Sequence, residues 1–225
     1  MCGRFSLNKT LGEVTKFLYD YFSIETNFIF SPKYNIAPSQ LIIAIIYDGN
    51  KYRSGLINWG LETKLADKKK TIINARCETL LQRPLFTPLL LKKRCLVLAD
   101  GFFEWQKPNQ TPHYCFLKDR SLFTMAGLWN TYCQDNDNKT SSCAIITTVA
   151  NQLMAPIHQR MPVILDEQNR KNWLNPKEQN GEKLISLLQP FPDQQMDYYP
   201  VSPLVNNPKN DFFDIIKPHN TKGVN

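Results

Sequence analysis

Residues 95–105 read Cys-Leu-Val-Leu-Ala-Asp-Gly-Phe-Phe-Glu-Trp, and this stretch decides the fold class that the sequence predicts. The apolar run 95–99 has the length of a buried strand, and the pair Asp100-Gly101 is typical of a turn. The chain then resumes with aromatic residues on both sides of Glu104. A short apolar run that stops at a turn and starts again favours strands that return to one sheet.

Similar patterns lie on both sides of this stretch. Further strands are expected at 41–47, 114–117, 122–128, 143–149 and 161–165. Helices are expected at 11–22, where Thr10 to Glu13 has the form of a capping box, from the cap Asp166 to Trp173, and at 183–188. Residues 30–39 contain two prolines and are expected to form a loop. Strands and helices do not alternate, which argues against a doubly wound fold. The sequence therefore predicts a strand-rich α+β domain with a mixed or antiparallel central sheet or barrel and flanking helices.

The length and composition fit one domain. The chain has 225 residues, of which 42% are hydrophobic, enough for a sizeable core. We expect the domain to span residues 1–207 and a polar, loose tail to span 208–225. No apolar run approaches the ~18–20 residues that cross a membrane. The N-terminus lacks the pattern of a signal peptide, so we expect a cytoplasmic protein, associated with the nucleoid if the source is bacterial. We expect a monomer.

The cysteine and histidine content argues against a metal or a cofactor. The six cysteines include no C-x-x-C pair, and there are only three histidines. The ligand spacing of a zinc site is therefore missing. Without a secretion signal, the thiols are expected to stay reduced. The sequence predicts neither a metal site nor a bound cofactor.

The formal net charge of +7 favours a polyanionic partner, and nucleic acid is the commonest of these. The alternative is that the positive charge serves solubility alone. Two clusters, 68–70 and 92–94, contribute to the excess and are expected in solvated loops or at element ends.

Cys2 is the residue with the most distinctive chemistry. Removal of Met1 would leave a chain that begins with cysteine and carries a free α-amine beside a thiol. The amine has an ordinary pKa of ~7.7–8.0 and the thiol one of ~8.5, so both react at neutral pH. An aldehyde can form an imine with this amine and then close through sulfur into a thiazolidine ring. The alternative is a cysteine at position 2 by chance.

Two further segments place polar residues among apolar ones. Glu104 lies between Phe103 and Trp105, where desolvation would raise its pKa and suit it to proton transfer. The alternative is that Glu104 faces solvent on a strand in which buried and exposed residues alternate. His158 precedes an expected strand, and its alternative is a hydrogen-bonded structural histidine. Asn74 and Arg76, taken alone, are more often a turn residue and a surface charge.

Together these segments resemble the SRAP family, the SOS response-associated peptidase-like proteins, which shield abasic sites in single-stranded DNA. The resemblance rests on an ordered set of motifs: M-C-G-R-F at 1–5, Y-N-I-A-P at 34–38, I-N-A-R at 73–76, A-D-G-F-F-E-W at 99–105, T-T at 147–148, I-H-Q-R-M-P at 157–162 and V-S-P-L-V-N at 201–206. These motifs are spread over nearly the whole chain. Each alone is weak, whereas the ordered set is highly specific.

The resemblance implies a role for each matching residue. Cys2 matches the residue that links covalently to the abasic sugar, and Asn74, Glu104 and His158 match the rest of that catalytic site. The expected DNA contacts are Arg4, Pro38, Arg76, Trp105, Thr147 and Arg160. Trp59 is a further candidate for stacking on bases. The lysine run that follows Trp59-Gly60 departs from the family pattern, and Cys77 is a second thiol near Asn74.

The resemblance therefore implies an enzyme that crosslinks itself to abasic sites in single-stranded DNA. In this hypothesis His158 and Glu104 open the closed sugar to its aldehyde, and Cys2 forms the thiazolidine. The first alternative is an N-terminal-nucleophile cysteine peptidase, in which Cys2 attacks an acyl carbon. A second alternative is a nucleic-acid-binding module without catalysis, which the charge alone supports.

Overall fold

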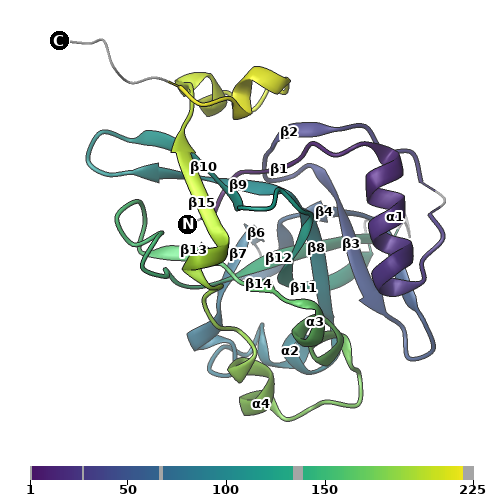
Figure 1. Cartoon of the computed structure of the whole chain (residues 1–225). Helices are drawn as coiled ribbons and strands as arrows, with labels where there is room; N and C mark the ends of the chain where they lie inside the picture. Colours follow the sequence, from purple (N-terminus) through teal and green to yellow (C-terminus); the bar gives the residue numbers. More distant parts are fainter. Residues whose placement is uncertain (1, 27, 66–67, 134–138, 220–225) are drawn as a thin grey trace.

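The computed structural model describes residues 2–26, 28–65, 68–133 and 139–219 (Figure 1). Met1, whose removal the Cys2 hypothesis requires, lies outside the described residues. The strands are β1 (Phe5–Leu7), β2 (Lys33–Ile36), β3 (Leu41–Tyr47), β4 (Tyr52–Trp59), β5 (Leu61–Leu65), β6 (Lys68–Ile72), β7 (Asn74–Arg76), β8 (Arg94–Ala99), β9 (Gly101–Gln106), β10 (Thr111–Leu117), β11 (Phe123–Cys133), β12 (Lys139–Val149), β13 (Arg160–Pro162), β14 (Ile164–Leu165) and β15 (Met196–Pro200). The helices are α1 (Leu11–Phe22), α2 (Thr87–Lys92), α3 (Glu167–Leu174) and α4 (Gly181–Ser186), with 3-10 turns η1 (Cys77–Thr79), η2 (Asp193–Gln195), η3 (Pro203–Asn206) and η4 (Phe213–Ile216).

A closed ring of strands forms the centre of the molecule. It runs β12-β4-β3-β8-β11 and closes because β11 also pairs with β12. The β12–β4 pair is parallel and the other pairs of the ring are antiparallel. Apolar side chains on both faces of these strands are buried, including the fully buried Ile45, Leu96 and Ile145. Burying such a side chain contributes roughly 1.5–3 kcal/mol. The prediction of a strand-rich α+β domain with a mixed central sheet or barrel is confirmed.

A second, antiparallel sheet of order β15-β10-β9-β1-β2 lies beside the ring. The stretch 94–106 joins the two, because β8 belongs to the ring and β9 to the second sheet. The junction requires Gly101, since a Cβ at this position would lie 2.2 Å from the hydroxyl of Tyr114. The pair Asp100-Gly101 is thus a corner between sheets. This corner fixes where β9 and its carboxylate, Glu104, lie.

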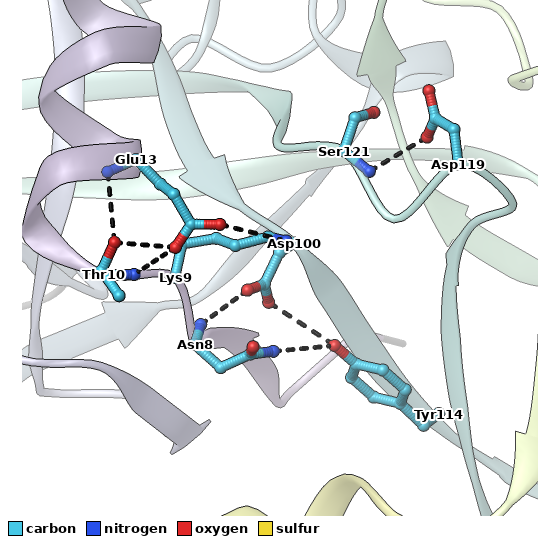
Figure 2. A network of polar contacts seen from close by, with 8 residues as sticks. All are labelled: Asn8, Lys9, Thr10, Glu13, Asp100, Tyr114, Asp119 and Ser121. Carbon is cyan, nitrogen blue, oxygen red and sulfur yellow. Dashed lines mark hydrogen bonds and ion pairs between the residues drawn. The ribbon is translucent and has the colours of Figure 1, made fainter.

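Asp100 anchors that corner through a buried polar network, part of which is drawn in Figure 2. One carboxylate oxygen accepts from the hydroxyl of Ser6 at 2.6 Å, and the other accepts from the backbone N–H of Asn8 at 2.6 Å. The hydroxyl of Tyr114 lies 2.9 Å from that of Ser6. These contacts tie the chain after β1 to the start of β9 and so position the N-terminal segment.

The helices cover the outside of the ring (Figure 1). Helix α1 begins at the predicted capping box of Thr10 and Glu13 and ends at Phe22, as expected. Its Phe22 ring contacts Tyr52 of β4 edge-on at 5.3 Å. Helix α3 has the predicted cap, Asp166, and packs against β8 and β14. Helix α4 covers 181–186, close to the predicted 183–188.

Several boundaries differ from the sequence prediction. The expected loop 30–39 contains β2, and the expected strand 161–165 is split into β13 and β14 at Val163. The expected tail begins with ordered structure, since Ile215 of η4 is fully buried and Asp211 accepts hydrogen bonds from the backbone of β2. Residues 220–225 of that tail lie outside the described residues.

Within the described ranges, no helix is both long and apolar enough to span a membrane. The same ranges contain no cluster of three or more histidine, cysteine or acidic side chains able to hold a metal ion.

Candidate active site

Cys2 and Asn74 meet between the two sheets. Strand β7 runs parallel to β12, with Asn74 in register with Ile145, and this places Asn74 at the side of the ring. Its side-chain amide donates a hydrogen bond of 2.7 Å to the backbone carbonyl of Cys2. The other side-chain atom of Asn74, Oδ1, is buried and accepts no hydrogen bond from the described residues. An unsatisfied acceptor at this position is available to a bound substrate or water.

Glu104 lies beside the same N-terminal segment. Strands β1 and β9 pair with Phe5 opposite Phe102, and the backbone N–H of Phe103 donates to the carbonyl of Arg4 at 2.9 Å. Glu104 is only 2% exposed. The alternative of an outward-facing glutamate is therefore wrong. Burial raises the pKa of Glu104 to about 7, which suits it to accept or release a proton at neutral pH.

The thiol of Cys2 is fully buried. Burial, to which the charge of Glu104 adds, raises the pKa of this thiol well above its ordinary value. The thiol donates to the carbonyl of Arg4 at 3.7 Å. It is therefore protonated at neutral pH, and it becomes a nucleophile only where a base takes its proton.

His158 lies on the segment that leads into β13 and is half-buried. Its Nδ1 accepts a hydrogen bond of 2.9 Å from the backbone N–H of Arg160 and lies 3.1 Å from the carbonyl of the same residue. Burial lowers the pKa of His158. The ring is therefore neutral at pH 7. His158 is thus hydrogen-bonded as a structural histidine would be, in a form that can also transfer a proton.

Arg160 is held by an ion pair and by the neighbouring strand. Its guanidinium donates to both carboxylate oxygens of Glu78, at 2.6 and 3.0 Å. It also donates to the carbonyl and hydroxyl of Thr147, at 2.6 and 3.2 Å. Thr147 is fully buried. The side chain of Thr147 therefore supports Arg160 in this structure.

Arg4 and Trp105 link the same region to the C-terminal turn η3. The guanidinium of Arg4 donates to Asn35 Oδ1 at 2.7 Å and to the carbonyl of Val205 at 2.6 Å, and it lies 6.0 Å from the ring centre of Trp105. The indole N–H of Trp105 donates to Asn206 Oδ1 at 2.8 Å. Both side chains, expected to contact DNA, therefore also hold η3 in place.

The remaining predicted residues differ in exposure. Arg76 is exposed on β7, two residues after Asn74, and Pro38 is half-buried in the turn after β2. Trp59 is fully buried, and its indole N–H donates to the carbonyl of Ile73 at 3.0 Å. The expectation that Trp59 could stack on DNA bases is wrong, because its ring belongs to the core. Cys77 is also buried, and burial raises the pKa of its thiol.

Sequence reasoning gave no role to four residues that shape this site: Asn35, Glu78, Asp100 and Asn206. Each lies inside one of the motifs or within two residues of it. Their roles come from partners more than thirty residues away, such as Arg4 for Asn35 and Arg160 for Glu78. The motifs mark the neighbourhood of each residue, but its distant hydrogen-bond partner cannot be identified from a single sequence.

Comparison with known proteins identifies a matching family. The model of a family described as SOS response associated peptidase (SRAP) matches residues 1–208. The chain belongs to the SRAP family. The match covers both sheets and each of the four catalytic candidates.

Two bacterial relatives match this SRAP protein over nearly its full length. The abasic site processing protein YoqW of Bacillus subtilis is 43% identical over 226 residues, which cover 97% of this chain and 100% of the relative. The abasic site processing protein YedK of Escherichia coli is 28% identical, with the same coverage. A solved structure of a protein from Bacteroides thetaiotaomicron has a TM-score of 0.81 and 26% identity, over 97% of this chain and 100% of that one.

Proposed function

We propose that this SRAP protein processes abasic sites in single-stranded DNA by joining Cys2 to the sugar in a covalent thiazolidine. The observation that carries the proposal is the hydrogen bond of 2.7 Å from Asn74 to the carbonyl of Cys2, with the buried carboxylate of Glu104 close enough to raise the pKa of the Cys2 thiol. The names of the relatives, abasic site processing proteins, support the same substrate.

The first step is the opening of the abasic sugar, which exists mostly as a closed hemiacetal. Opening requires an acid at the ring oxygen and a base at the hydroxyl of C1′. The pKa of about 7 for Glu104 and the neutral ring of His158 suit this exchange of protons. The product is an aldehyde at C1′.

The second step is capture by the 1,2-aminothiol that loss of Met1 would create. The α-amine of Cys2 adds to C1′ and water leaves, which gives an imine. The sulfur of Cys2 then adds to the same carbon, and the thiol proton ends on nitrogen. One C–N and one C–S bond form, the C=O bond is lost, and one water is released. Because the thiol is protonated in the free protein, Glu104 is the base that assists this ring closure.

The amide of Asn74 holds the backbone of Cys2 and so fixes where the amine lies. A backbone held in place lowers the entropic cost of bringing amine and aldehyde together. The unsatisfied Oδ1 of Asn74 is a ready acceptor for a sugar hydroxyl. The exposed Arg76, two residues along β7, is suited to a flanking phosphate.

The protonation state of Cys2 argues against the peptidase alternative. Cysteine peptidases attack with a thiolate whose pKa is lowered by its surroundings. Here burial raises the pKa of the Cys2 thiol. An amine that attacks first and a thiol that closes second are more compatible with this environment.

The test is incubation of the purified protein, with Met1 removed, with a single-stranded oligonucleotide that contains one abasic site. We expect a heat-stable adduct on a denaturing gel. The variant Cys2→Ala and protein that retains Met1 should form none, whereas Cys77→Ala should behave as wild type. A salt-sensitive complex without any adduct would favour a binding module. Cleavage of peptides with the same Cys2 dependence, and no adduct, would favour a peptidase.

A further inference from the structure

The ion pair between Glu78 and Arg160 has a form that bears on DNA binding. The two guanidinium nitrogens Nη1 and Nη2 donate to the two carboxylate oxygens of Glu78, at 2.6 and 3.0 Å. This is the parallel, bidentate geometry by which arginine also binds a phosphate. The side chain of Arg160 is 14% exposed and that of Glu78 is 45% exposed. The anion therefore lies on the solvent side of the guanidinium.

Arg160 has few donors left for any other anion. Nη2 also donates to the carbonyl of Thr147 at 2.6 Å, and Nε is buried without a hydrogen-bond partner among the described residues. The carboxylate of Glu78 thus occupies the face on which a phosphate would have to bind. A phosphate can accept hydrogen bonds from both Nη1 and Nη2 only if this carboxylate moves away.

The pair is placed beside the proposed reaction centre by the strand order. Glu78 lies on η1, directly after β7, which carries Asn74. Arg160 begins β13, and both β7 and β13 pair with β12. On β12, Thr147 is in register with Arg76 and contacts Arg160. A strand that runs past Asn74 and Arg76 would therefore meet this pair.

We propose that Glu78 is an internal stand-in for a DNA phosphate, which occupies Arg160 in the DNA-free protein and weakens binding to undamaged single strands. This inference rests on the proposed function and assigns to that function a residue that determines specificity. An undamaged strand must displace the carboxylate of Glu78. Only its phosphate contacts can offset the free energy that is lost with the ion pair. A strand with an abasic site also gains two covalent bonds at Cys2. The pair thereby favours retention at damaged sites.

The charge state of Glu78 agrees with this role. Burial acts to raise its pKa, but the hydrogen bonds and the charge of Arg160, together with smaller hydrogen-bond contributions from its own backbone and from Cys77, lower the pKa on balance. Glu78 is therefore an anion throughout the neutral range and competes with phosphate at any physiological pH.

The test measures the affinity for an undamaged oligothymidine with wild type, Glu78→Gln and Glu182→Gln. Glu182 is exposed on α4, so its variant makes the same change in net charge away from the pair. We expect Glu78→Gln to bind about fivefold more tightly, the effect of releasing one partly exposed ion pair. The slope of log K against log salt should steepen by about 0.7, for one added phosphate contact. Glu182→Gln should bind as wild type does.

A double-mutant cycle assigns the effect to Arg160. Arg160→Gln alone should change the affinity of wild type less than twofold, because Glu78 already occupies the Nη donors that a phosphate would use, but it should remove the whole gain of Glu78→Gln. If Glu78→Gln has too low a melting temperature for the assay, Glu78→Ser provides a second neutral variant. Equal or weaker binding by both Glu78 variants, or a gain that survives Arg160→Gln, would overturn the inference. Adduct formation by wild type on abasic DNA is scored separately and decides the proposed function alone.

Discussion

Replacing Glu104 by glutamine should make the protein more stable at neutral and alkaline pH. Glu104 is 2% exposed, and burial raises its pKa from 4.5 to about 7. Glutamine has nearly the same shape and carries no charge. The variant therefore removes the cost of burying an ionised carboxylate, while it retains most of the packing around β9.

The sign and the size of this change in stability follow from proton linkage. As the pH rises from 4.5, the unfolded chain loses this proton first, whereas the folded protein keeps it until about pH 7. The folded state binds more protons in this window, so the stability of wild type falls across it and levels off above it. Each pH unit corresponds to about 1.4 kcal/mol, and the full window therefore costs wild type up to about 3 kcal/mol.

The assay is urea unfolding of wild type and Glu104→Gln between pH 4.5 and 8. The difference in unfolding free energy should grow by about 3 kcal/mol in favour of the variant between pH 4.5 and 7.5. In thermal melts this corresponds to roughly 6–12 °C for a domain of this size. Parallel curves for the two proteins would show that Glu104 has an ordinary pKa, and its role as a proton acceptor near pH 7 would lose its basis.

Three further substitutions test other parts of the account. Arg4→Ala removes charged hydrogen bonds to Asn35 and to η3 and should lower the free energy of unfolding by about 1.5–3 kcal/mol, measured by urea denaturation. An unchanged midpoint would mean that these contacts contribute nothing. Asp100→Asn turns one acceptor into a donor that faces Ser6 or a backbone N–H, and should cost about 1–3 kcal/mol in the same assay. Asn74→Ala should slow adduct formation at least about tenfold, in line with the loss of one hydrogen bond that orients Cys2. A wild-type rate would remove Asn74 from the mechanism.

The sequence predicted most of the long elements, because their signals are local. The capping box at Thr10 and the apolar runs of β3 and β8 depend on neighbouring residues only. The shortest strands carry no such signal. Strand β7 has three residues and exists because β12 pairs with it, a partner about seventy residues away. The closure of the ring likewise depends on the β12–β4 and β11–β12 pairings, which no local pattern contains.

The features of the candidate site likewise divide into those with a local sequence signal and those that depend on distant residues. The desolvation of Glu104 could be predicted, since aromatic residues flank it in the sequence. The burial of Trp59 could not, because its indole N–H is fixed by the carbonyl of Ile73, which lies outside its own strand. The engagement of Arg160 by Glu78 also depends on two distant segments that meet at β12. Charged side chains that a motif assigns to DNA can thus already have an internal partner.

Mass spectrometry of the crosslinked N-terminal peptide tests the central claim most directly. The protein is reacted with abasic single-stranded DNA, digested with protease and nuclease, and sequenced by fragmentation. We expect a peptide that begins at Cys2, without Met1, whose mass is that of peptide plus sugar fragment less one water, with both nitrogen and sulfur of Cys2 bonded to C1′. Attachment at a lysine or at Cys77, or a link that borohydride reduces as a simple imine, would contradict the account.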